Sequence, residues 1–309
     1  MKTAVTGAFG YSGRYIAKRL LEAGHSVITL TNSLNRVNPF GKSVQPFPFH
    51  FDEPGRLVES LREVEVLINT YWVRFDHKLF SHEGAVANTK ILFKAAKEAG
   101  VKRIIHVSIT NPDINSDLPY FRGKAELEAA LNGLGTSYCI LRPTVLFGKE
   151  DVLINNIAWS LRHLPVFGMF GAGNYRLQPI YVDDLAAAAV EKAIGDRNEV
   201  VEAIGPETFT YRELAERIRA VLGIKRLILN LPPDLGYWGC RAVGLFVRDV
   251  VITREEIKGL MEGRLYVNAP PLGATRLTDW MVEHGGKLGL RYTSEMTRRV
   301  DRFSEYPSN

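Results

Sequence analysis

The chain has 309 residues, of which 46% are hydrophobic and 24% charged, values typical of a globular protein with a full core. Its net charge of +5 at pH 7 comes from lysines and arginines scattered along the chain, which argues against nucleic-acid binding. We therefore expect a small-molecule substrate as partner, with the chain acting as a monomer or homodimer.

The first expected elements are a buried strand over residues 2–5 and a helix over 14–22. Glycines in the turn between them let the backbone approach a pyrophosphate, and the helix N-terminus offers free N–H groups and the positive end of its dipole. An ordinary tight turn would also explain a lone glycine triplet. Because this turn opens a βαβ pattern, it predicts dinucleotide binding. The predicted contact residues are Gly7, Ala8, Phe9, Gly10, Tyr11, Ser12 and Gly13.

Strand and helix patterns alternate through the next hundred residues. Strands are predicted over 26–31, 44–51, 64–70, 103–109 and 138–142, and helices over 79–99 and 124–131. Strands separated by helices of this length imply a parallel sheet covered on both faces. The prediction is an α/β fold, a doubly wound parallel-sheet Rossmann domain over 1–148, to which 176–204 returns.

The pattern loosens from residue 149, where we expect a smaller, mostly helical C-terminal substrate region extending to residue 309. Helices are predicted over 151–162, 183–194 and 211–222, the last behind Thr210 as a cap, with extended segments over 176–182 and 199–204. Packing is the commoner role for the large side chains of this region, although they could line a substrate site. These side chains are Trp159, Met169, Phe170, Trp238 and Trp280.

The least polar late stretch is residues 235–252. Arg241, Arg248 and Asp249 interrupt it, so it cannot comfortably span a bilayer. An amphipathic helix resting on a partner or a membrane surface stays open as an interpretation. The chain begins directly with a strand and its two cysteines, Cys139 and Cys240, lie far apart, so we expect a cytoplasmic protein in a reducing compartment.

Tyr120 and Lys124 form a candidate catalytic pair. Residues i and i+4 share one helical face, so both side chains are expected to project together. An ammonium group beside a phenol favours the phenolate and makes tyrosine a usable general acid/base. Ser108 or Thr110, at the end of the fifth strand, would hold a substrate oxygen. A solvent-facing pair is the alternative, since this spacing is common by chance.

Through these residues the chain resembles the short-chain dehydrogenase/reductase superfamily, in its extended and atypical branch of NAD-dependent epimerases and dehydratases. The resemblance covers about the first two hundred residues and extends to the Tyr120/Lys124 pair. Within the branch, the chain is most similar to the subgroup of the nucleotide-binding accessory subunit of respiratory complex I. The other segments that carry the resemblance are Thr6-Gly7-x-x-Gly10-x-x-Gly13, Leu141-Arg142-Pro143-Thr144-Val145-Leu146-Phe147-Gly148 and Gln178-Pro179-Ile180-Tyr181-Val182-Asp183-Asp184-Leu185-Ala186.

The resemblance implies a role for each matching residue. Tyr120 would be the acid/base, Lys124 would also bind the nicotinamide ribose, and Ser108 or Thr110 would orient the substrate. Asp52 matches a residue near the adenine, with a helix cap before Pro54 as its alternative. Thr70 and Pro143 complete the expected cofactor set.

Three features depart from the family pattern. The interval between the hydroxyl position and Tyr120 is short, which argues for a different or smaller substrate. Ser108, Ile109 and Thr110 compete for the hydroxyl position. Tyr71 and Trp72 place bulky rings where small residues are usual, so they either line an apolar pocket or block one.

The end of the second strand indicates the cofactor preference. An acid there would accept a hydrogen bond from the ribose 2′-hydroxyl of NAD, but this chain has no acid between Thr31 and Arg36. We therefore expect NADP to be preferred over NAD, with Asn32, Ser33 and Arg36 around the 2′-phosphate. A solvated arginine in a turn is the alternative.

The histidines give no metal site. His77 and His82 are five residues apart and do not align on one helical face, and no third ligand is evident, so we predict no metal. His106, inside the fifth strand, is more typical of a satisfied core histidine than of a catalyst.

The function expected from these residues is that of an NAD(P)-dependent oxidoreductase or epimerase-like enzyme, with Tyr120 exchanging the proton during hydride transfer at a carbonyl or alcohol carbon. The alternative is a catalytically idle protein that binds the dinucleotide for assembly, regulation or redox sensing. An intact Tyr-x-x-x-Lys favours the enzyme, whereas Tyr71, Trp72 and the ambiguous hydroxyl favour the alternative.

Overall fold

A computed structural model describes residues 1–306 and divides them into two compact units. Unit 1 comprises residues 1–143, 182–203 and 302–306. Unit 2 comprises residues 144–181 and 204–301. The return of the chain to the first unit is therefore shorter than the predicted 176–204.

Unit 1 is built on a seven-stranded sheet in which every strand pair is parallel. Its strands read as short apolar runs because both faces of the sheet are covered. The predicted Rossmann fold is confirmed. The strands, in sheet order, are β11 (Glu199–Ala203), β6 (Ser137–Pro143), β5 (Arg103–Val107), β4 (Val66–Asn69), β1 (Lys2–Thr6), β2 (Ser26–Leu30) and β3 (Val44–Phe47).

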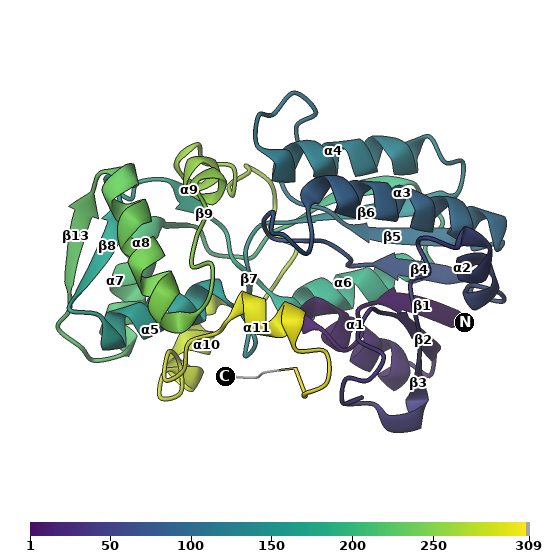
Figure 1. Ribbon diagram of the computed structural model, residues 1–309, viewed down its shortest axis with the longest axis horizontal. Coiled ribbons are helices and arrows are strands. Elements are labelled where there is room, and N and C mark those ends of the chain that lie inside the picture. The colour runs from purple at the N-terminus through teal and green to yellow at the C-terminus, as the bar shows by residue number, and fades with distance from the viewer. Residues whose placement is uncertain (307–309) are drawn as a thin grey trace. The chain divides into compact units, whose positions relative to one another are not determined.

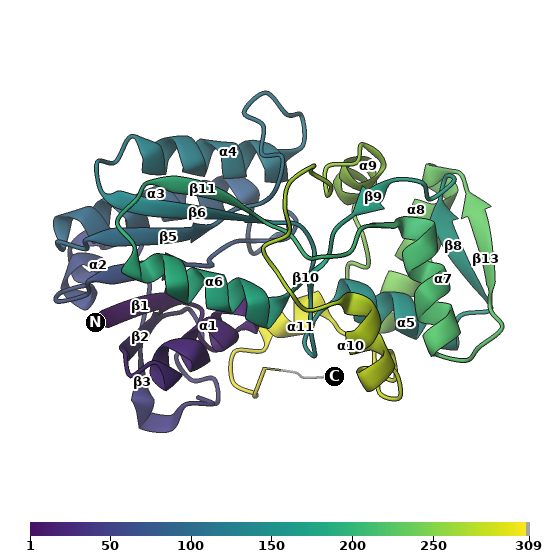
Figure 2. The same ribbon diagram turned by 180° about the vertical axis from the view of Figure 1, so that it is seen from behind.

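Helices cover both faces of this sheet, as a doubly wound fold requires. Figures 1 and 2 show α3 (His82–Glu98) and α4 (Pro119–Asn132) on one face, with α1 (Tyr11–Glu22) and α6 (Val182–Ile194) on the other. The short helix α2 (Pro54–Ser60) packs beside α3, and a 3-10 turn, η1 (Gly41–Ser43), precedes β3.

Two predicted helix starts shift for local chemical reasons. Helix α3 begins at His82 because the Ser81 hydroxyl accepts a hydrogen bond from the Gly84 N–H at 3.0 Å, a side-chain cap. Helix α4 begins at Pro119, five residues earlier than predicted, because proline is favoured in the first helical turn, where its missing N–H costs nothing.

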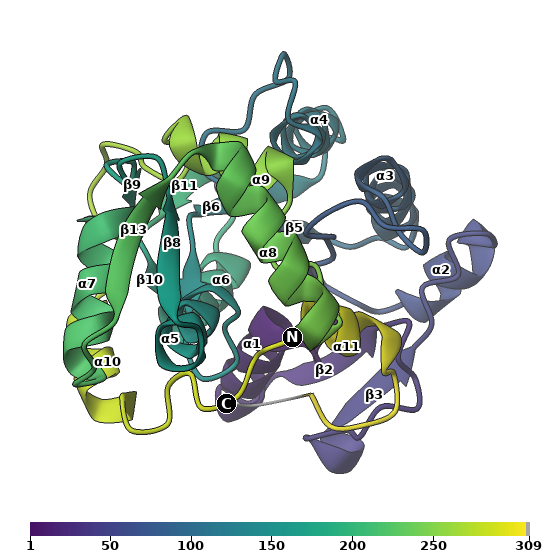
Figure 3. The ribbon, with the colours of Figure 1, turned by 60° about the vertical axis from the view of Figure 1, so that its left-hand side comes forward.

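Unit 2 contains three two-stranded sheets, and the segment predicted as extended over 176–182 contributes to two of them. The parallel pair β8–β13 was missed in the sequence and lies between α7 and α8 (Figure 3). The paired strands are β7 (Leu146–Phe147) with β10 (Ile180–Tyr181), β9 (Arg176–Leu177) with β12 (Phe209–Thr210), and β8 (Val166–Phe170) with β13 (Leu227–Leu231).

Helices supply most of the remaining structure of unit 2. Thr210 caps α7 as predicted, since its hydroxyl and the Glu213 carboxylate form a capping box. Trp159, Met169, Phe170 and Trp280 are buried, whereas Trp238 is exposed. The helices are α5 (Leu153–His163), α7 (Tyr211–Val221), α8 (Pro233–Val247), α9 (Arg254–Met261), α10 (Leu277–His284) and α11 (Glu295–Val300).

Gly13 sets the distance between α1 and the preceding turn, which generates a stability prediction. A Cβ at Gly13 would lie 2.3 Å from the Gly7 carbonyl oxygen, a contact that only a backbone shift can relieve. Gly13→Ala should therefore lower the free energy of unfolding by about 1–3 kcal/mol in urea denaturation. Gly55→Ala, in α2 with open space around the new Cβ, is the control and should be neutral or stabilising. Equal stability of the two variants would contradict the close-packing argument.

Candidate functional site

The β1–α1 turn leaves a helix N-terminus available to an anion. Gly7 has φ of +67°, a conformation that favours glycine, and its carbonyl accepts a hydrogen bond from the Gly10 N–H at 2.8 Å. Helix α1 has no side-chain cap at Gly10 and no acidic residue in its first turn. A glycine N-cap and a first turn without acidic residues fit a pyrophosphate on this glycine turn.

The turn lies where the strand order of the sheet reverses. The chain runs outward from β1 through β2 to one edge and then from β4 to the other, so the carboxyl ends of β1 and β4 form the switch point at which α/β folds bind ligands. The Thr70 N–H donates to the Thr6 hydroxyl at 2.7 Å, and the Thr70 hydroxyl donates to the Thr6 carbonyl at 2.6 Å. These bonds fix Thr70 beside the glycine turn.

The end of β2 brings Arg36 into a buried position. The Thr31 hydroxyl accepts a hydrogen bond from the Ser33 N–H at 3.0 Å, and the Arg36 N–H donates to the Ser33 carbonyl at 3.1 Å. Arg36 is buried, so the alternative of a solvated arginine in a turn does not describe it.

Arg36 and Arg14, which lies in the first turn of α1, both contact the aromatic ring of Tyr306. The guanidinium carbons of Arg36 and Arg14 lie 5.5 Å and 5.6 Å from the centre of the Tyr306 ring. A Cβ added at Gly10 would lie 4.0 Å from the same ring. The Arg302 guanidinium donates to the Asn32 carbonyl at 3.2 Å in the same segment. Two cations therefore converge beside the glycine turn. Arg14 and Tyr306 were missed in the sequence, although Arg14 directly follows Gly13.

The remaining predicted cofactor residues are spread around this end of the sheet. The Ala8 N–H donates to the Thr29 hydroxyl at 2.9 Å, and Phe9 is buried, while Tyr11 and Ser12 open α1. Asp52 is exposed and does not cap α2, whose N-cap is Glu53. Pro143 ends β6 and is buried.

Lys124 is the least expected feature of the site. It shares a face of α4 with Tyr120 as predicted, but only 2% of it is exposed. Its ammonium group donates to the Val107 carbonyl at 2.8 Å and lies 4.4 Å from the centre of the Trp72 ring. Burial lowers the pKa of Lys124 to about 7, against a smaller opposing effect of the Glu128 carboxylate. The lysine is thus held under Trp72, against the end of β5.

Trp72 contacts both Lys124 and Tyr120 on α4. Its indole packs so closely on α4 that a Cβ at Gly123 would lie 2.9 Å from it, which explains the glycine at that position. Tyr120 is half-buried, with its ring 5.5 Å from Trp72 and 5.8 Å from His82. Tyr71 packs instead against Phe49 and Phe51.

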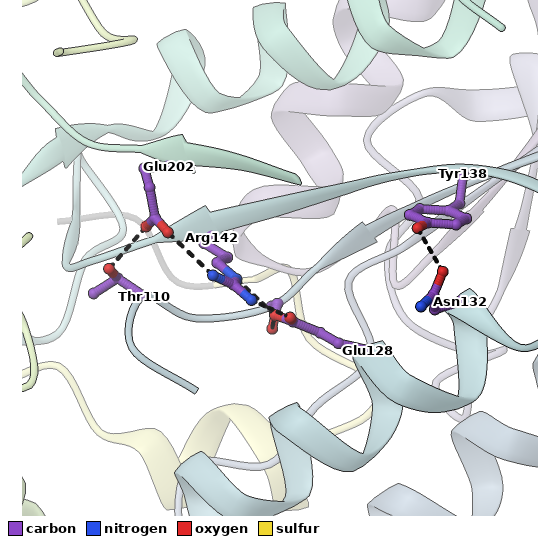
Figure 4. Close-up of polar contacts among 7 residues, drawn as sticks. Thr110, Glu128, Asn132, Tyr138, Arg142 and Glu202 are labelled. Atoms are coloured by element: carbon purple, nitrogen blue, oxygen red, sulfur yellow. Dashed lines mark hydrogen bonds and ion pairs between the residues drawn. The ribbon is translucent and has the colours of Figure 1, made fainter. Parts of the chain in front are cut away.

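The two candidate hydroxyls both donate to carboxylates. Figure 4 shows the Thr110 hydroxyl on Glu202 and the Arg142 guanidinium between Glu202 and Glu128. The Ser108 hydroxyl donates to Glu128 at 2.6 Å, and that of Thr110 to Glu202 at 2.8 Å. Arg142 lies 2.5 Å from Glu128 and 3.3 Å from Glu202, and chiefly the Glu128 bond raises the pKa of Arg142.

This ion network was missed in the sequence. A signal was present, because Glu128 follows Lys124 by four residues and Tyr120 by eight and so extends the same stripe of α4. Arg142 belongs to one of the segments that carry the family resemblance, but the sequence alone did not reveal that it pairs with Glu128 and Glu202.

The histidines serve packing and local pairing. His106 is fully buried and contacts Asn69 at 3.1 Å, and burial together with Lys124 holds the pKa of His106 well below its usual value. The imidazole is therefore neutral at pH 7, as expected of a core histidine. His82 pairs with Asp76 at 2.8 Å. Within residues 1–306, no group of three or more histidine, cysteine, aspartate or glutamate side chains is arranged to hold a metal ion.

Comparisons with known proteins indicate the family and the fold of the chain. A model of the NAD dependent epimerase/dehydratase family matches residues 3–201. The chain is 29% identical over 223 residues to the NADH dehydrogenase (ubiquinone) 1 alpha subcomplex subunit 9, mitochondrial, of Arabidopsis thaliana, across 69% of this chain and 56% of that protein. It is 30% identical over 241 residues to the NADH-ubiquinone oxidoreductase 40 kDa subunit, mitochondrial, of Neurospora crassa, across 75% and 63%. The chain thus spans less than two thirds of either relative.

Among solved structures, the triphenylmethane reductase of Citrobacter sp. complexed with NADP(H) superposes with a TM-score of 0.77 at 19% identity, covering 92% of this chain and all of that one. The NADPH-dependent quinone oxidoreductase QOR2 of Escherichia coli gives a TM-score of 0.73 at 23% identity, covering 91% and 99%. These likenesses show a shared fold.

The buried state of Lys124 predicts a pH dependence of stability. Because its pKa is about 7 in the folded chain and about 10.4 in an unfolded one, the unfolded chain binds more protons between these values, and stability should rise with pH across that window. Lys124→Met removes this contribution. Near pH 7 the variant should have the higher free energy of unfolding in urea denaturation, because it has no buried ammonium group. The difference between the two proteins should shrink from pH 7 to pH 10. Lys18→Met, on the exposed part of α1, is the control, and parallel curves for all three proteins would contradict the burial of the charge.

Proposed function

The chain belongs to the NAD dependent epimerase/dehydratase family, and we propose that it binds NADP(H) in unit 1 and acts through the bound dinucleotide rather than through acid–base chemistry of Tyr120 and Lys124. The bound nucleotide would then serve assembly, regulation or redox sensing. The observation that carries the proposal is the burial of Lys124 against the Val107 carbonyl.

The residues of unit 1 fit a dinucleotide. The glycine turn and the uncapped N-terminus of α1 would hold the pyrophosphate. Arg36 and Arg14 would supply charge-assisted contacts to a 2′-phosphate, which favours NADP(H) over NAD(H). Both guanidinium groups contact Tyr306, so the 2′-phosphate would share this place with Tyr306 or displace it. When bound, a nicotinamide supplies or accepts a hydride.

The arrangement of the other family positions supports a non-catalytic role. A lysine that serves the nicotinamide ribose needs an accessible ammonium group, whereas Lys124 is 2% exposed and its hydrogen bond goes to the backbone. Ser108 and Thr110 already donate their protons to carboxylates. Two relatives that the chain resembles are named as subunits of an NADH–ubiquinone oxidoreductase, which supports a role within or beside a larger assembly.

The second candidate is an oxidoreductase or epimerase-like enzyme with Tyr120 as the acid/base. One observation favours it: Tyr120 is only half-buried and stands on α4 in the family spacing to Lys124. In that case the phenol would exchange the proton while Ser108 or Thr110 accepted a hydrogen bond from the substrate.

The cofactor preference is tested by Arg36→Ala. We expect the unmodified protein to bind NADPH more tightly than NADH, and the variant to lose about 1–3 kcal/mol for NADPH with little change for NADH, because only NADPH carries the 2′-phosphate. Isothermal titration calorimetry measures both. Arg56→Ala, an exposed arginine paired with Glu53, is the matched control. Equal losses for the two cofactors, or tighter binding of NADH, would contradict the assignment of Arg36.

The choice between the two functions is tested by Tyr120→Phe. We expect NADPH affinity within about twofold of the unmodified protein, and no oxidation of NADPH by either protein with a panel of ketones, aldehydes and quinones. Turnover by the unmodified protein that falls a hundredfold or more in Tyr120→Phe would instead establish the enzyme, since the variant removes only the transferable proton.

A further inference from the structure

Helix α8 of unit 2 carries a face of exposed apolar side chains. Leu235, Trp238, Leu245 and Phe246 are 57%, 60%, 81% and 83% exposed. Their spacing of three, seven and one residues places all four on one side of the helix, with the small residues Gly239 and Ala242 between them. Four large apolar side chains on one helix face form a contiguous exposed patch of the kind that marks an interaction site. We call these four residues the α8 face.

The opposite side of α8 fixes this orientation. A Cβ at Gly236 would lie 2.7 Å from the Phe170 ring, and one at Gly244 would lie 2.6 Å from the Asp249 carbonyl oxygen. Gly236 and Gly244 are the buried residues of α8. The helix rests on the β8–β13 pair through Gly236 (Figure 3), and on the segment that follows α8 through Gly244. The α8 face points outward as a consequence of this packing and needs no rearrangement to become available.

Strand β13 carries two further exposed apolar residues, Leu227 and Leu229. Because side chains alternate along a strand, both lie on the same face of β13 as Leu231, whose Cβ is near Gly236 of α8.

Positive charge borders the α8 face. Arg241 is three residues after Trp238 and four residues before Leu245, so it lies beside both on the helix surface. Arg248 follows the last turn of α8 in a left-handed conformation with φ of 54°. Both are exposed, and in the part of the chain that the structure describes neither forms an ion pair or a hydrogen bond. The nearby acids are occupied, since Asp234 pairs with Arg254 at 3.3 Å and Asp249 is buried on the backbone N–H groups of α11.

We propose that the α8 face is a docking surface for an anionic lipid bilayer. Tryptophan, phenylalanine and leucine on one side of a helix with arginines along its edge match a helix lying in the headgroup region, where the rings and chains leave water and the guanidinium groups meet phosphate. The face is the convex side of a helix, which a fluid bilayer accommodates without a complementary groove. Within residues 1–306 no helix is long and apolar enough to cross a bilayer, so the contact is peripheral.

Vesicle co-sedimentation of the full chain tests the proposal. The protein should pellet with vesicles of phosphatidylcholine and phosphatidylglycerol at 7:3, and less with phosphatidylcholine alone or at high salt. The double variant Leu245→Ser, Phe246→Ser should reduce the bound fraction at least tenfold, and Arg241→Gln, Arg248→Gln should remove the preference for the anionic lipid. Val282→Ser, which makes the same kind of change at an exposed site on α10, is the control and should bind as the unmodified protein.

Fluorescence locates the contact. Vesicles containing a dibrominated lipid should quench part of the tryptophan emission, and Trp238→Phe should remove that part. Of the other three tryptophans, Trp159 and Trp280 are buried and Trp72 packs on α4 of unit 1. Absence of vesicle binding by the unmodified protein, or unchanged binding by the double variant, would overturn the proposal. So would a dimer in light scattering that the double variant dissociates while vesicles stay unbound, since the face would then join copies of this chain. NADPH titration of the same variants keeps this result separate from the proposed function.

Discussion

The ion network of Arg142 with Glu128 and Glu202 is the interaction around which the candidate site is arranged. It links α4, β6 and β11 in unit 1 (Figure 4). Each carboxylate also accepts a hydrogen bond from a hydroxyl group in the segment that follows β5. Loss of Arg142 would leave the buried Glu128 carboxylate without its cation, which destabilises the fold. The network therefore fixes α4 on the sheet, and with it the place of Lys124 one turn before Glu128.

The position of α4 on the sheet leaves Lys124 bonded to the backbone, unlike the role that the family resemblance implies for it. The glycine turn, the switch point between β1 and β4 and the two arginines beside Tyr306 retain what a phosphorylated dinucleotide needs. The same sheet edge, however, directs the ammonium of Lys124 into the protein, under Trp72. Under the proposed function, nucleotide binding does not require catalysis in this chain, and the α8 face of unit 2 would add a surface for recruiting the nucleotide-bound protein.

The parts of the fold that depend on local sequence were predicted, and the parts that depend on distant contacts were not. The glycine turn, the parallel strands and the shared face of Tyr120 and Lys124 follow from neighbouring residues. The direction of Lys124 depends on Trp72, which lies on another strand end, and the contact between Arg14 and Tyr306 joins residues 292 positions apart. The β8–β13 pair was missed because two short strands from distant segments carry no periodic signal.

A crystal structure of the protein with NADPH bound would show whether Lys124 is a structural residue in a dinucleotide-binding protein. We expect the pyrophosphate on the glycine turn, with the Lys124 Nζ still donating to the Val107 carbonyl beneath Trp72. A structure in which Nζ has left Val107 and lies within about 3.2 Å of a nicotinamide ribose hydroxyl, beside the Tyr120 phenol, would contradict it.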